Sequence, residues 1–555
     1  MRLVLVLVMA LAWACSGGGP AQDAGAGEVT EVAGGDTRDW VTPGPDWQRR
    51  TVFYQVWVRS FQDSNGDGIG DLPGLISRLD YLEALGIGAL WLSPIHPTPY
   101  ADSGYDVADY RAVNPDYGTL EDFQRLVEEA HARGIRVFAD LVMNHTSDQH
   151  AWFQESRSSK DNPRADWYLW ADQPNLPCTP GLQFGDSAWK WDEGRGQYYF
   201  HQFYEGQPDL NYRNPEVAAA MLDVARFWLG KGVDGFRVDA IYTLFEDLPG
   251  TPEDQFICGH HPLTHAYLKT LRQVLEEYPQ RASLAEVWGP TGTTAAYFGD
   301  GQDEFHLALS MDQELAIQGA LMLDAPSLLA PKLTDTLGRL PEGTQYATFL
   351  SSHDWPRVMH QTGNDPARAR LAAVLLLTLP GTPIVYYGDE VGATNTTAQV
   401  VDKRDGSRAP MPWTAAPDLG FTTGTPWLAP APGNETACVA AQDQDPDSLL
   451  ALYRRLIALR NRLDFLGSAP IRVLRPATST DKLLLFVREA QGRTLLVALS
   501  FAKQALPLTL DLSALVSVAA TLELTSEAEV PALTPQNAAA YQVTLGPHGY
   551  AVWSL

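Results

Sequence analysis

The feature that most constrains this chain is a regular alternation of short apolar runs with amphipathic stretches, from residue 50 to residue 390. Runs such as "TVFYQVWV" are rich in β-branched and aromatic residues and predict buried strands. Between them, as in "LEDFQRLVEEAHARG", apolar residues recur every three to four positions, which predicts helices. The expected strands are 51–58, 88–93, 135–142, 233–239, 282–287, 305–310, 345–350 and 382–387. Eight strands, each followed by a helix, predict an α/β fold of the (β/α)8 TIM-barrel type.

Two parts of the chain depart from this alternation. About 75 residues separate the third strand from the helix before the fourth, and a loop this long is usually functional or a small domain. We therefore expect an inserted domain B over 144–212, which leaves 46–143 and 213–465 for the barrel. Later runs such as "KLLLFVREAQGRTLLVALSF" predict antiparallel hairpins, and hence a C-terminal β-sandwich, domain C, over 466–555.

The N-terminus is typical of an exported protein. Arg2 precedes a short apolar run that ends at Cys15, too short to span a membrane. The stretch "LAWAC" resembles a bacterial lipobox, in which the cysteine is lipidated, although Ala12 and Trp13 are not its usual residues. The low-complexity segment 16–45 predicts a tether. We expect a periplasmic, secreted or membrane-anchored protein, held in the last case by lipidated Cys15.

The net charge limits the kinds of ligand that the protein can bind, and the cysteines suggest one disulfide. The formal net charge of −27 argues against nucleic acid, because phosphate binding needs clustered Lys and Arg. A neutral or cationic ligand is compatible, and solubility alone would also explain the charge. Cys178 and Cys258 lie in loop-like sequence, so we favour that pair for a disulfide over one with Cys438. No Cys/His spacing suggests zinc.

The stretch "DSNGDGIGD", residues 63–71, follows the pattern of a calcium loop. Such loops place oxygen ligands at positions 1, 3, 5, 7 and 9 and glycine at position 6. Position 12, usually a bidentate Glu, is Gly74 here. A polar surface turn explains the same composition. If the loop binds Ca²⁺, the expected ligands are Asp63, Asn65, Asp67, the Ile69 carbonyl and Asp71.

Charged residues gather where four predicted strands end. Barrel enzymes carry their catalytic residues at the C-terminal ends of the strands. The relevant sequences are "DLVMNH", "GFRVDA", "LAEVW" and "FLSSHD", which supply His145, Arg237, Asp239, Glu286, His353 and Asp354. Two carboxylates on adjacent strands suit glycoside hydrolysis. Arg237 points to the same side as Asp239, so we expect it to depress the pKa of that carboxyl group.

These four segments resemble the conserved regions of the α-amylase family of glycoside hydrolases, and the likeness runs from about Thr51 to Leu555. The resemblance implies a retaining mechanism with Asp239 as nucleophile, Glu286 as acid/base and Asp354 as the carboxylate that grips the sugar. It implies that the same subsite is lined by Arg237, His145, His353 and the stacking residue Tyr105. One residue departs from the family's pattern, because Ser352 stands where the family usually has Asn.

Further short segments resemble those of one subgroup of this family, which contains α-glucosidases, oligo-1,6-glucosidases and trehalose synthases. "QPDLN" (207–211) matches its marker, and the 63–71 loop matches its structural calcium site. In resembling α-glucosidases, an Asp–Arg pair blocks the pocket behind the terminal sugar, and the equivalent residues here are Asp102 and Arg404. Arg408 would face the next sugar. The small Ala240 after the nucleophile accompanies α-1,4 preference, with α-1,6 left open.

The leading hypothesis is an exported, exo-acting α-glucosidase that hydrolyses maltose and short maltooligosaccharides, acting as a monomer on α-glucan oligosaccharides. One alternative is a trehalose synthase, which isomerises maltose in the same closed pocket. A second is an endo-α-amylase, and a third is a catalytically dead sugar-binding relative. The presence of all three carboxylates argues against the last.

Overall fold

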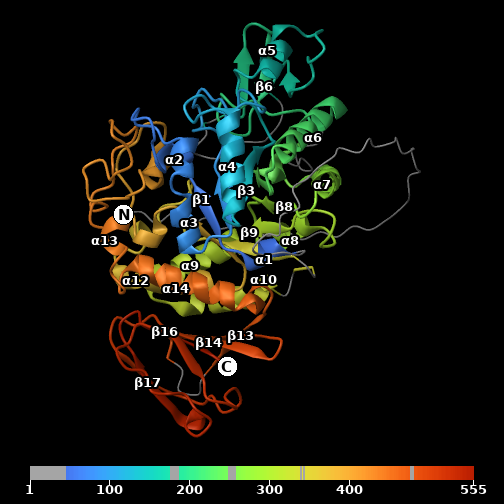
Figure 1. The fold of residues 1–555 in the computed structure, drawn as a ribbon. Helices are drawn as coiled ribbons and strands as arrows, with labels where there is room; N and C mark the ends of the chain where they lie inside the picture. The colour runs from blue at the N-terminus through green and yellow to red at the C-terminus, as the bar shows by residue number, and fades with distance from the viewer. Residues whose placement is uncertain are drawn as a thin grey trace, which may run out of the picture. The chain divides into compact units, whose positions relative to one another are not determined.

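The eight predicted barrel strands are present in the computed structural model. They are β1 (Phe53–Val56), β2 (Ala89–Leu92), β3 (Arg136–Val142), β7 (Gly235–Asp239), β8 (Ala282–Ala285), β9 (Leu307–Leu309), β10 (Gln345–Thr348) and β11 (Thr382–Tyr386). They close into a barrel in the order β1-β11-β10-β9-β8-β7-β3-β2, and every pairing is parallel. Figure 1 shows the labelled barrel strands β1, β3, β8 and β9 among the helices. The predicted TIM barrel is confirmed.

The structure describes residues 46–555 except 175–184, 186, 248–257, 338–339, 342–343 and 476–479. The predicted signal, lipidation site and tether therefore lie outside the described residues, as does Cys178. The described residues belong to one compact unit. Cys258 is disulfide-bonded, whereas Cys438 is buried and free. In the described part of the chain, no helix is both long enough and apolar enough to cross a bilayer.

Helices surround the barrel, and most of them bury one face. The main ones are α3 (Leu79–Leu85), α4 (Leu120–Ala132), α6 (Pro215–Gly230), α7 (Pro262–Glu276), α9 (Met311–Leu323), α12 (Pro366–Thr378) and α14 (Leu449–Arg462). The second half of α12 is instead buried on every side. Shorter ones include α2 (Leu72–Ile76), α8 (Thr291–Ala295) and α10 (Ala330–Leu337). Thr119 caps α4 in a capping box with Asp122, which fixes where that helix begins.

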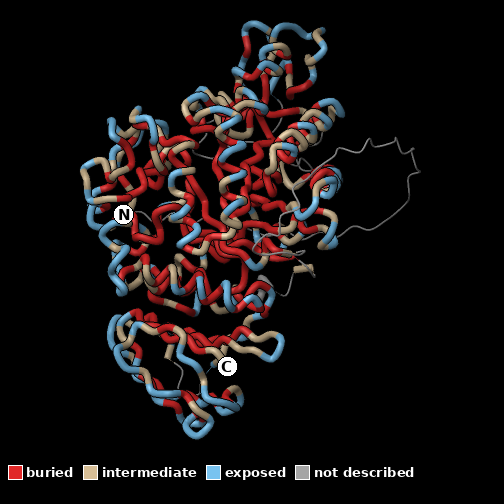
Figure 2. Tube along the Cα trace, viewed as in Figure 1, coloured by how far each residue is buried: buried red, intermediate tan, exposed pale blue. Residues whose placement is uncertain are grey.

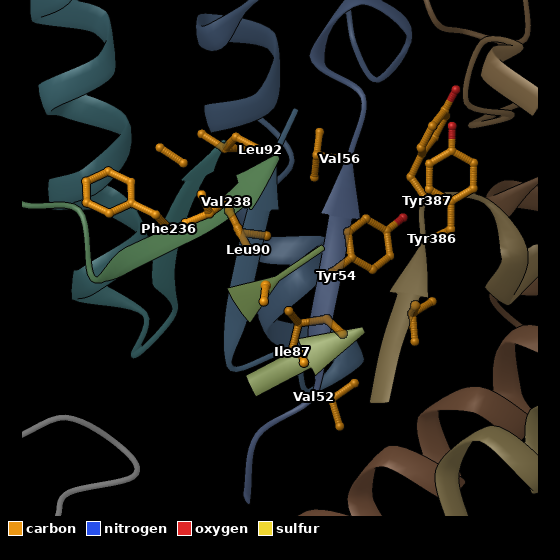
Figure 3. Packing of buried hydrophobic residues seen from close by; sticks show 14 of the residues in the cluster. Val52, Tyr54, Val56, Ile87, Leu90, Leu92, Phe236, Val238, Tyr386 and Tyr387 are labelled. Carbon is orange, nitrogen blue, oxygen red and sulfur yellow. The ribbon is translucent and has the colours of Figure 1, made fainter. Parts of the chain in front are cut away.

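Strand residues alternate between two cores. Side chains such as Tyr54, Leu90 and Val238 point outward into the layer between strands and helices (Figure 3). The opposite set, which includes Phe53, Trp91, Phe138 and Leu284, fills the barrel interior. The strands are buried throughout, as Figure 2 shows. Because side chains alternate with period two, the inward rows continue from these apolar residues to the polar ones at the strand ends.

Domain B contains α5 (Ala151–Ser158) and a small antiparallel sheet of β4 (Trp170–Ala171), β6 (Gln197–Phe200) and β5 (Trp189–Asp192), in that order. Packed aromatic rings, among them Phe153, Trp170 and Tyr199, hold it together. A bridge between His145 and Asp209 links the two ends of the insertion. The insertion therefore begins and ends beside the C-terminal end of β3.

Domain C is an antiparallel sandwich. Its larger sheet has the order β12 (Ile471–Leu474), β13 (Leu483–Ala490), β14 (Arg493–Ser500), β18 (Tyr550–Ser554) and β16 (Thr521–Thr525), and the smaller pairs β15 (Leu506–Leu510) with β17 (Tyr541–Leu545). In β13, Leu484 and Phe486 join the main core that includes the barrel helices, whereas Leu485 and Val487 face the smaller sheet. The central strands of the larger sheet are thus buried on both faces, whereas its edge strands β12 and β16 are partly exposed.

Candidate active site

Arg237 lies at the centre of the candidate site, buried on an inward row of β7. Its Nη1 donates to Asp239 Oδ1 at 2.7 Å and to Asp140 Oδ1 at 2.7 Å. Its Nη2 contacts Glu286 Oε2, from the residue that follows β8. One planar guanidinium therefore touches both expected catalytic carboxylates and holds them close together.

Glu286 presents its two oxygens to different neighbours. Oε2 accepts from Arg237 and, at 3.1 Å, from the backbone N–H of Ala240. Among the described residues, Oε1 accepts a hydrogen bond only from the indole Nε1 of Trp288, at 3.3 Å. Because its other oxygen is held by two donors, Oε1 is the oxygen available for proton transfer to a ligand.

Asp354 follows β10 and is surrounded by cationic side chains. Arg404 Nη1 donates to its Oδ1 at 3.0 Å, His353 Nε2 lies 3.1 Å from its Oδ2, and Arg408 Nη2 lies 3.5 Å from Oδ1. Burial raises the pKa of Asp354, but the neighbouring His353, Arg404 and Arg408 outweigh it and hold the pKa well below its usual range. Asp354 is therefore an anion that can accept hydrogen bonds from sugar hydroxyls.

The prediction that Arg408 faces a second sugar is wrong. Its side chain is fully buried. It donates to the His353 carbonyl at 3.0 Å and to Ser103 Oγ at 2.9 Å, and it pairs with Asp405. Arg408, at the end of the 3-10 helix Lys403–Arg408, is thus buried beside Asp354 and supports that carboxylate.

The Asp–Arg pair expected at the closed end of the pocket is present. Arg404 Nη2 contacts Asp102 Oδ1, and Gln207 Nε2 donates to Asp102 Oδ2 at 3.0 Å. Gln207 also lies 3.0 Å from His145 Nε2, which ties "QPDLN" to this wall. Arg404 therefore links Asp102 to Asp354 across the site.

Tyr105 and His353 stack face to face, with ring centroids 5.1 Å apart. His353 is stacked on its other face by Trp57, at 5.5 Å, and its Nδ1 lies 2.8 Å from Gln55 Nε2. Tyr105 donates to Asp140 Oδ2 at 2.9 Å, which fixes its ring at the cavity wall. His353 is therefore buried between two rings and orients Asp354.

Arg237 lowers the pKa of Asp239, as expected, but it does not decide the net shift. Burial raises the pKa of Asp239 well above its usual value, and Arg237 opposes this only in part. The nearby Glu286, Asp140 and Asp354 raise it further. One arginine is shared among several carboxylates, a crowding that the spacing of Arg237 and Asp239 in the sequence does not reveal.

A cavity of about 670 Å³ brings most of the predicted residues together. Its lining includes Asp102, Tyr105, His145, Asp239, Glu286, Asp354 and Arg404. Sequence reasoning did not identify the further lining residues Phe203, Tyr242, Trp288, Trp355, Pro356, Asn395, Lys403 and Ser407. Trp288 and Trp355 could have been found, because each lies within two residues of a candidate carboxylate.

In the 63–71 loop, nearby backbone N–H groups donate hydrogen bonds to the carboxylate oxygens and hold them in place. Asp63 Oδ1 accepts from the N–H groups of Asn65 (2.9 Å) and Gly66 (2.8 Å). Asp71 caps α2 by accepting from Gly74 N at 2.6 Å. A Cβ at Gly74 would lie 2.1 Å from the Gln62 carbonyl oxygen, so no closing Glu fits at that position.

The donor atoms of this loop are all oxygens, the set that Ca²⁺ prefers. No group of three or more His, Cys, Asp or Glu side chains that could hold a metal is found among the described residues. The expected ligands of this loop also include the amide oxygen of Asn65 and the backbone carbonyl oxygen of Ile69, which do not belong to those four kinds of side chain. The loop fits Ca²⁺ by its chemistry, and calcium binding stays a prediction.

The fold and the site define a barrel enzyme with paired carboxylates suited to glycoside chemistry. The alpha amylase catalytic domain model matches residues 55–468, and the maltogenic amylase C-terminal domain model matches residues 471–552. The chain belongs to the α-amylase family of glycoside hydrolases and is an enzyme of the α-glucosidase-related group.

Its relatives have several activities. The chain is 38% identical to trehalose synthase/amylase TreS of Mycobacterium tuberculosis, over 91% of this chain and 90% of the relative. It is 38% identical to oligo-1,6-glucosidase of Heyndrickxia coagulans (82% and 92%) and 35% identical to glucan 1,6-alpha-glucosidase of Streptococcus pneumoniae (84% and 93%).

Comparison with solved structures agrees with this family assignment. The alpha-glucosyl transfer enzyme XgtA is 34% identical, with a TM-score of 0.80, over 92% of this chain and 100% of that one. Trehalulose synthase MutB of Pseudomonas mesoacidophila is 31% identical, with a TM-score of 0.81, over the same shares. The family therefore contains both hydrolases and glucosyl-transferring enzymes at similar distances from this chain.

Proposed function

We propose that this protein is a retaining, exo-acting α-glucosidase that cleaves the terminal α-glucosidic bond of maltose and short maltooligosaccharides. The observation that carries the proposal is the single guanidinium of Arg237 in contact with both Asp239 and Glu286. Retaining enzymes need two carboxyl groups only about 5 Å apart, whereas inverting enzymes leave room for a water molecule.

In this mechanism Asp239 attacks the anomeric carbon while Glu286 donates its proton to the glycosidic oxygen. The bond to the leaving sugar breaks and a covalent glucosyl–Asp239 ester forms. Glu286, now ionised, takes a proton from water, and the water oxygen attacks the anomeric carbon and releases Asp239. The second inversion restores the original anomeric configuration.

Exo action is supported by the pairing of Asp102 with Arg404 at one wall of the cavity. The test is the product profile from maltose, isomaltose and a maltooligosaccharide blocked at both ends. We expect α-glucose from maltose, slower release from isomaltose and no cleavage of the blocked chain. Cleavage of the blocked chain would instead identify an endo-amylase.

The second candidate is a trehalose synthase, in which the second glucose attacks the ester in place of water. The similarity to TreS and to trehalulose synthase favours it. Incubation with maltose separates the candidates, because the hydrolase gives glucose and the isomerase gives trehalose. We propose mainly glucose, since the 670 Å³ cavity reaches the exposed ring of Trp288 and so admits water.

Three further properties belong to the proposal. Ca²⁺ would bind in a structural role through Asp63, Asn65, Asp67, the Ile69 carbonyl and Asp71. The enzyme would be an exported monomer tethered to a membrane by lipidated Cys15. Replacing Cys15 by Ala should move the protein from the membrane fraction to the soluble fraction, and an unchanged distribution would rule out the lipid tether.

A further inference from the structure

The outer face of α9 and the turn that follows it expose apolar side chains. The exposed residues between 311 and 330 are Leu315, Met322, Leu323, Ser327 and Leu328. The four apolar ones are between 45% and 68% exposed, whereas the polar Gln313 and Glu314 of the same helix are buried. A helix that is apolar on its outer face as well as its inner face is expected to meet a further apolar surface.

The exposed apolar side chains form one patch around Gly319. A Cβ at Gly319 would lie 3.4 Å from Leu328 Cδ1, so Leu328, in the 3-10 helix η5 (Pro326–Leu328), lies against this glycine. Leu315 precedes Gly319 by four positions, and Met322 and Leu323 follow it by three and four. Residues at these spacings share one face of a helix. We call Leu315, Met322, Leu323 and Leu328 the α9 patch.

Cationic side chains gather at the C-terminal end of the α9 patch, where Asp324 follows Leu323. The Asp324 carboxylate pairs with Arg368 at 2.8 Å and with Lys503 at 3.3 Å, and its carbonyl accepts from Lys482 Nζ at 2.7 Å. The Lys503 side chain is 72% exposed, in a chain whose formal net charge is −27. Apolar side chains bordered by lysines suit a bilayer surface, because the apolar groups enter it while the ammonium groups stay among the headgroups.

The predicted tether, residues 16–45, joins the described fold beside α9. Arg49, in α1 (Trp47–Arg50), lines a cavity of about 220 Å³ together with Gln313 of α9. A tether of this length spans about 100 Å when fully extended and about 30 Å on average when flexible. A chain anchored through Cys15 would therefore keep the α9 patch within reach of the bilayer, at an effective concentration that allows even a weak contact to form.

We propose that the α9 patch is a membrane-docking surface that enters the headgroup region of the bilayer to which the tether is anchored. The partner that fits is a lipid bilayer, because the patch is aliphatic and Ser327 is the only other exposed residue of the segment. A protein interface would combine such apolar area with hydrogen bonds and aromatic side chains. This inference rests on the proposed membrane tether and adds a second contact between the enzyme and the membrane.

Met322 is a native probe of the α9 patch, because it is the only exposed methionine among the described residues. The full chain is coupled through the Cys15 thiol to a maleimide phospholipid in vesicles of phosphatidylethanolamine and phosphatidylglycerol. Oxidation of Met322 by chloramine-T, an ionic oxidant that stays in water, is then followed by mass spectrometry. Coupling to vesicles should slow this oxidation by at least about fivefold relative to the uncoupled chain.

Leu263→Met is the matched control, because Leu263 is 40% exposed on α7 and does not belong to the α9 patch. The methionine introduced there should be oxidised at the same rate with and without vesicles. Leu315→Ser combined with Leu323→Ser should return Met322 oxidation on vesicles to within about twofold of the uncoupled rate, because the patch loses two apolar side chains. Maltose turnover should not change, since neither residue lines the active-site cavity.

Two results would overturn the proposal. One is a Met322 that is oxidised equally fast in coupled and uncoupled chains. The other is protection in solution without vesicles that grows with protein concentration, because a second copy of the chain would then cover the patch. Coupling in vitro makes this test independent of lipidation in the cell, so a failed tether, seen as an unchanged distribution of the Cys15→Ala protein, is distinguished from a failed docking surface.

Discussion

Asp102 is the residue whose charge should decide how well the terminal sugar is held. It pairs with Arg404 and accepts a 3.0 Å hydrogen bond from Gln207. A hydrogen bond to a charged group is worth about 1.5–3 kcal/mol, so Asp102→Asn should lower kcat/KM for maltose by about tenfold to a hundredfold. Steady-state kinetics will measure this. Glu128→Gln, on the exposed face of α4, is the control, and an unchanged Asp102→Asn enzyme would mean that Asp102 does not hold the terminal sugar.

Asp239 should lower the stability of the folded protein while being required for its activity. Burial raises its pKa, with Arg237 opposing and Glu286 adding to the rise. A raised folded-state pKa means that the protein loses stability as pH rises above the unfolded value of about 4. Asp239→Asn should therefore raise Tm by about 1–3 °C at pH 7, with the gain vanishing near pH 3.5, and should lower kcat more than about a thousandfold. A variant that is less stable at pH 7, or nearly as active as the parent, would contradict this assignment.

At the residue scale, the sequence predicts where the candidate site residues lie better than it predicts the burial and charge of their surroundings. Asp239, Glu286 and Asp354 lie where strand ends and period-two alternation place them. The burial of Arg408 and the net rise of the Asp239 pKa were not predicted, since both depend on how loops from different strands fold over the barrel. Trp288 and Trp355 lie 67 positions apart, and only the folded barrel shows that their rings stack.

The loop 63–71 is an element whose stability should depend on Ca²⁺. Its fold is joined to a distant segment, because Asp63 N donates to Phe421 O at 2.9 Å and Trp427 N donates to Gly68 O at 2.9 Å. Removing Ca²⁺ with EGTA should lower Tm by several degrees, as expected when a native-state ligand is lost, and re-adding Ca²⁺ but not Mg²⁺ should restore it. Asp67→Ala should abolish this response. A Tm that EGTA does not change would mean that the loop is a polar turn without metal.

At the element scale, each barrel strand overlaps the run that predicts it, because buried parallel strands are apolar throughout. The elements inside domain B were not predicted. Strands such as β4, with two residues, are too short to show any periodicity. In domain C, the run that contains β13 is apolar on both faces, and the structure explains this by the two cores that it joins.

At the scale of the whole molecule, domain C and the barrel share buried contacts that should make them unfold together. Arg488 of β13 is fully buried and donates to three carbonyls: Thr378 at the end of α12 (2.8 Å), Leu466 (2.6 Å) and Ala469 (2.9 Å). Burial lowers the pKa of Arg488 because its guanidinium has no carboxylate partner among the described residues, and Arg460 nearby adds to the effect. The carbonyls of α12 and its neighbours stabilise this charge.

Arg488→Ala should therefore orphan these carbonyls and leave a cavity between domain C and the barrel. We expect the free energy of unfolding to fall by about 3–5 kcal/mol, measured by urea denaturation, with loss of activity at the same urea concentration as loss of structure. Arg472→Ala is the matched control, because Arg472 is an exposed arginine of β12 paired only with Glu489, and it should change stability by less than about 1 kcal/mol. Separate transitions in the parent enzyme, with domain C unfolding while activity persists, would show that the barrel is stable without these contacts, and the shared core would then not couple the two domains.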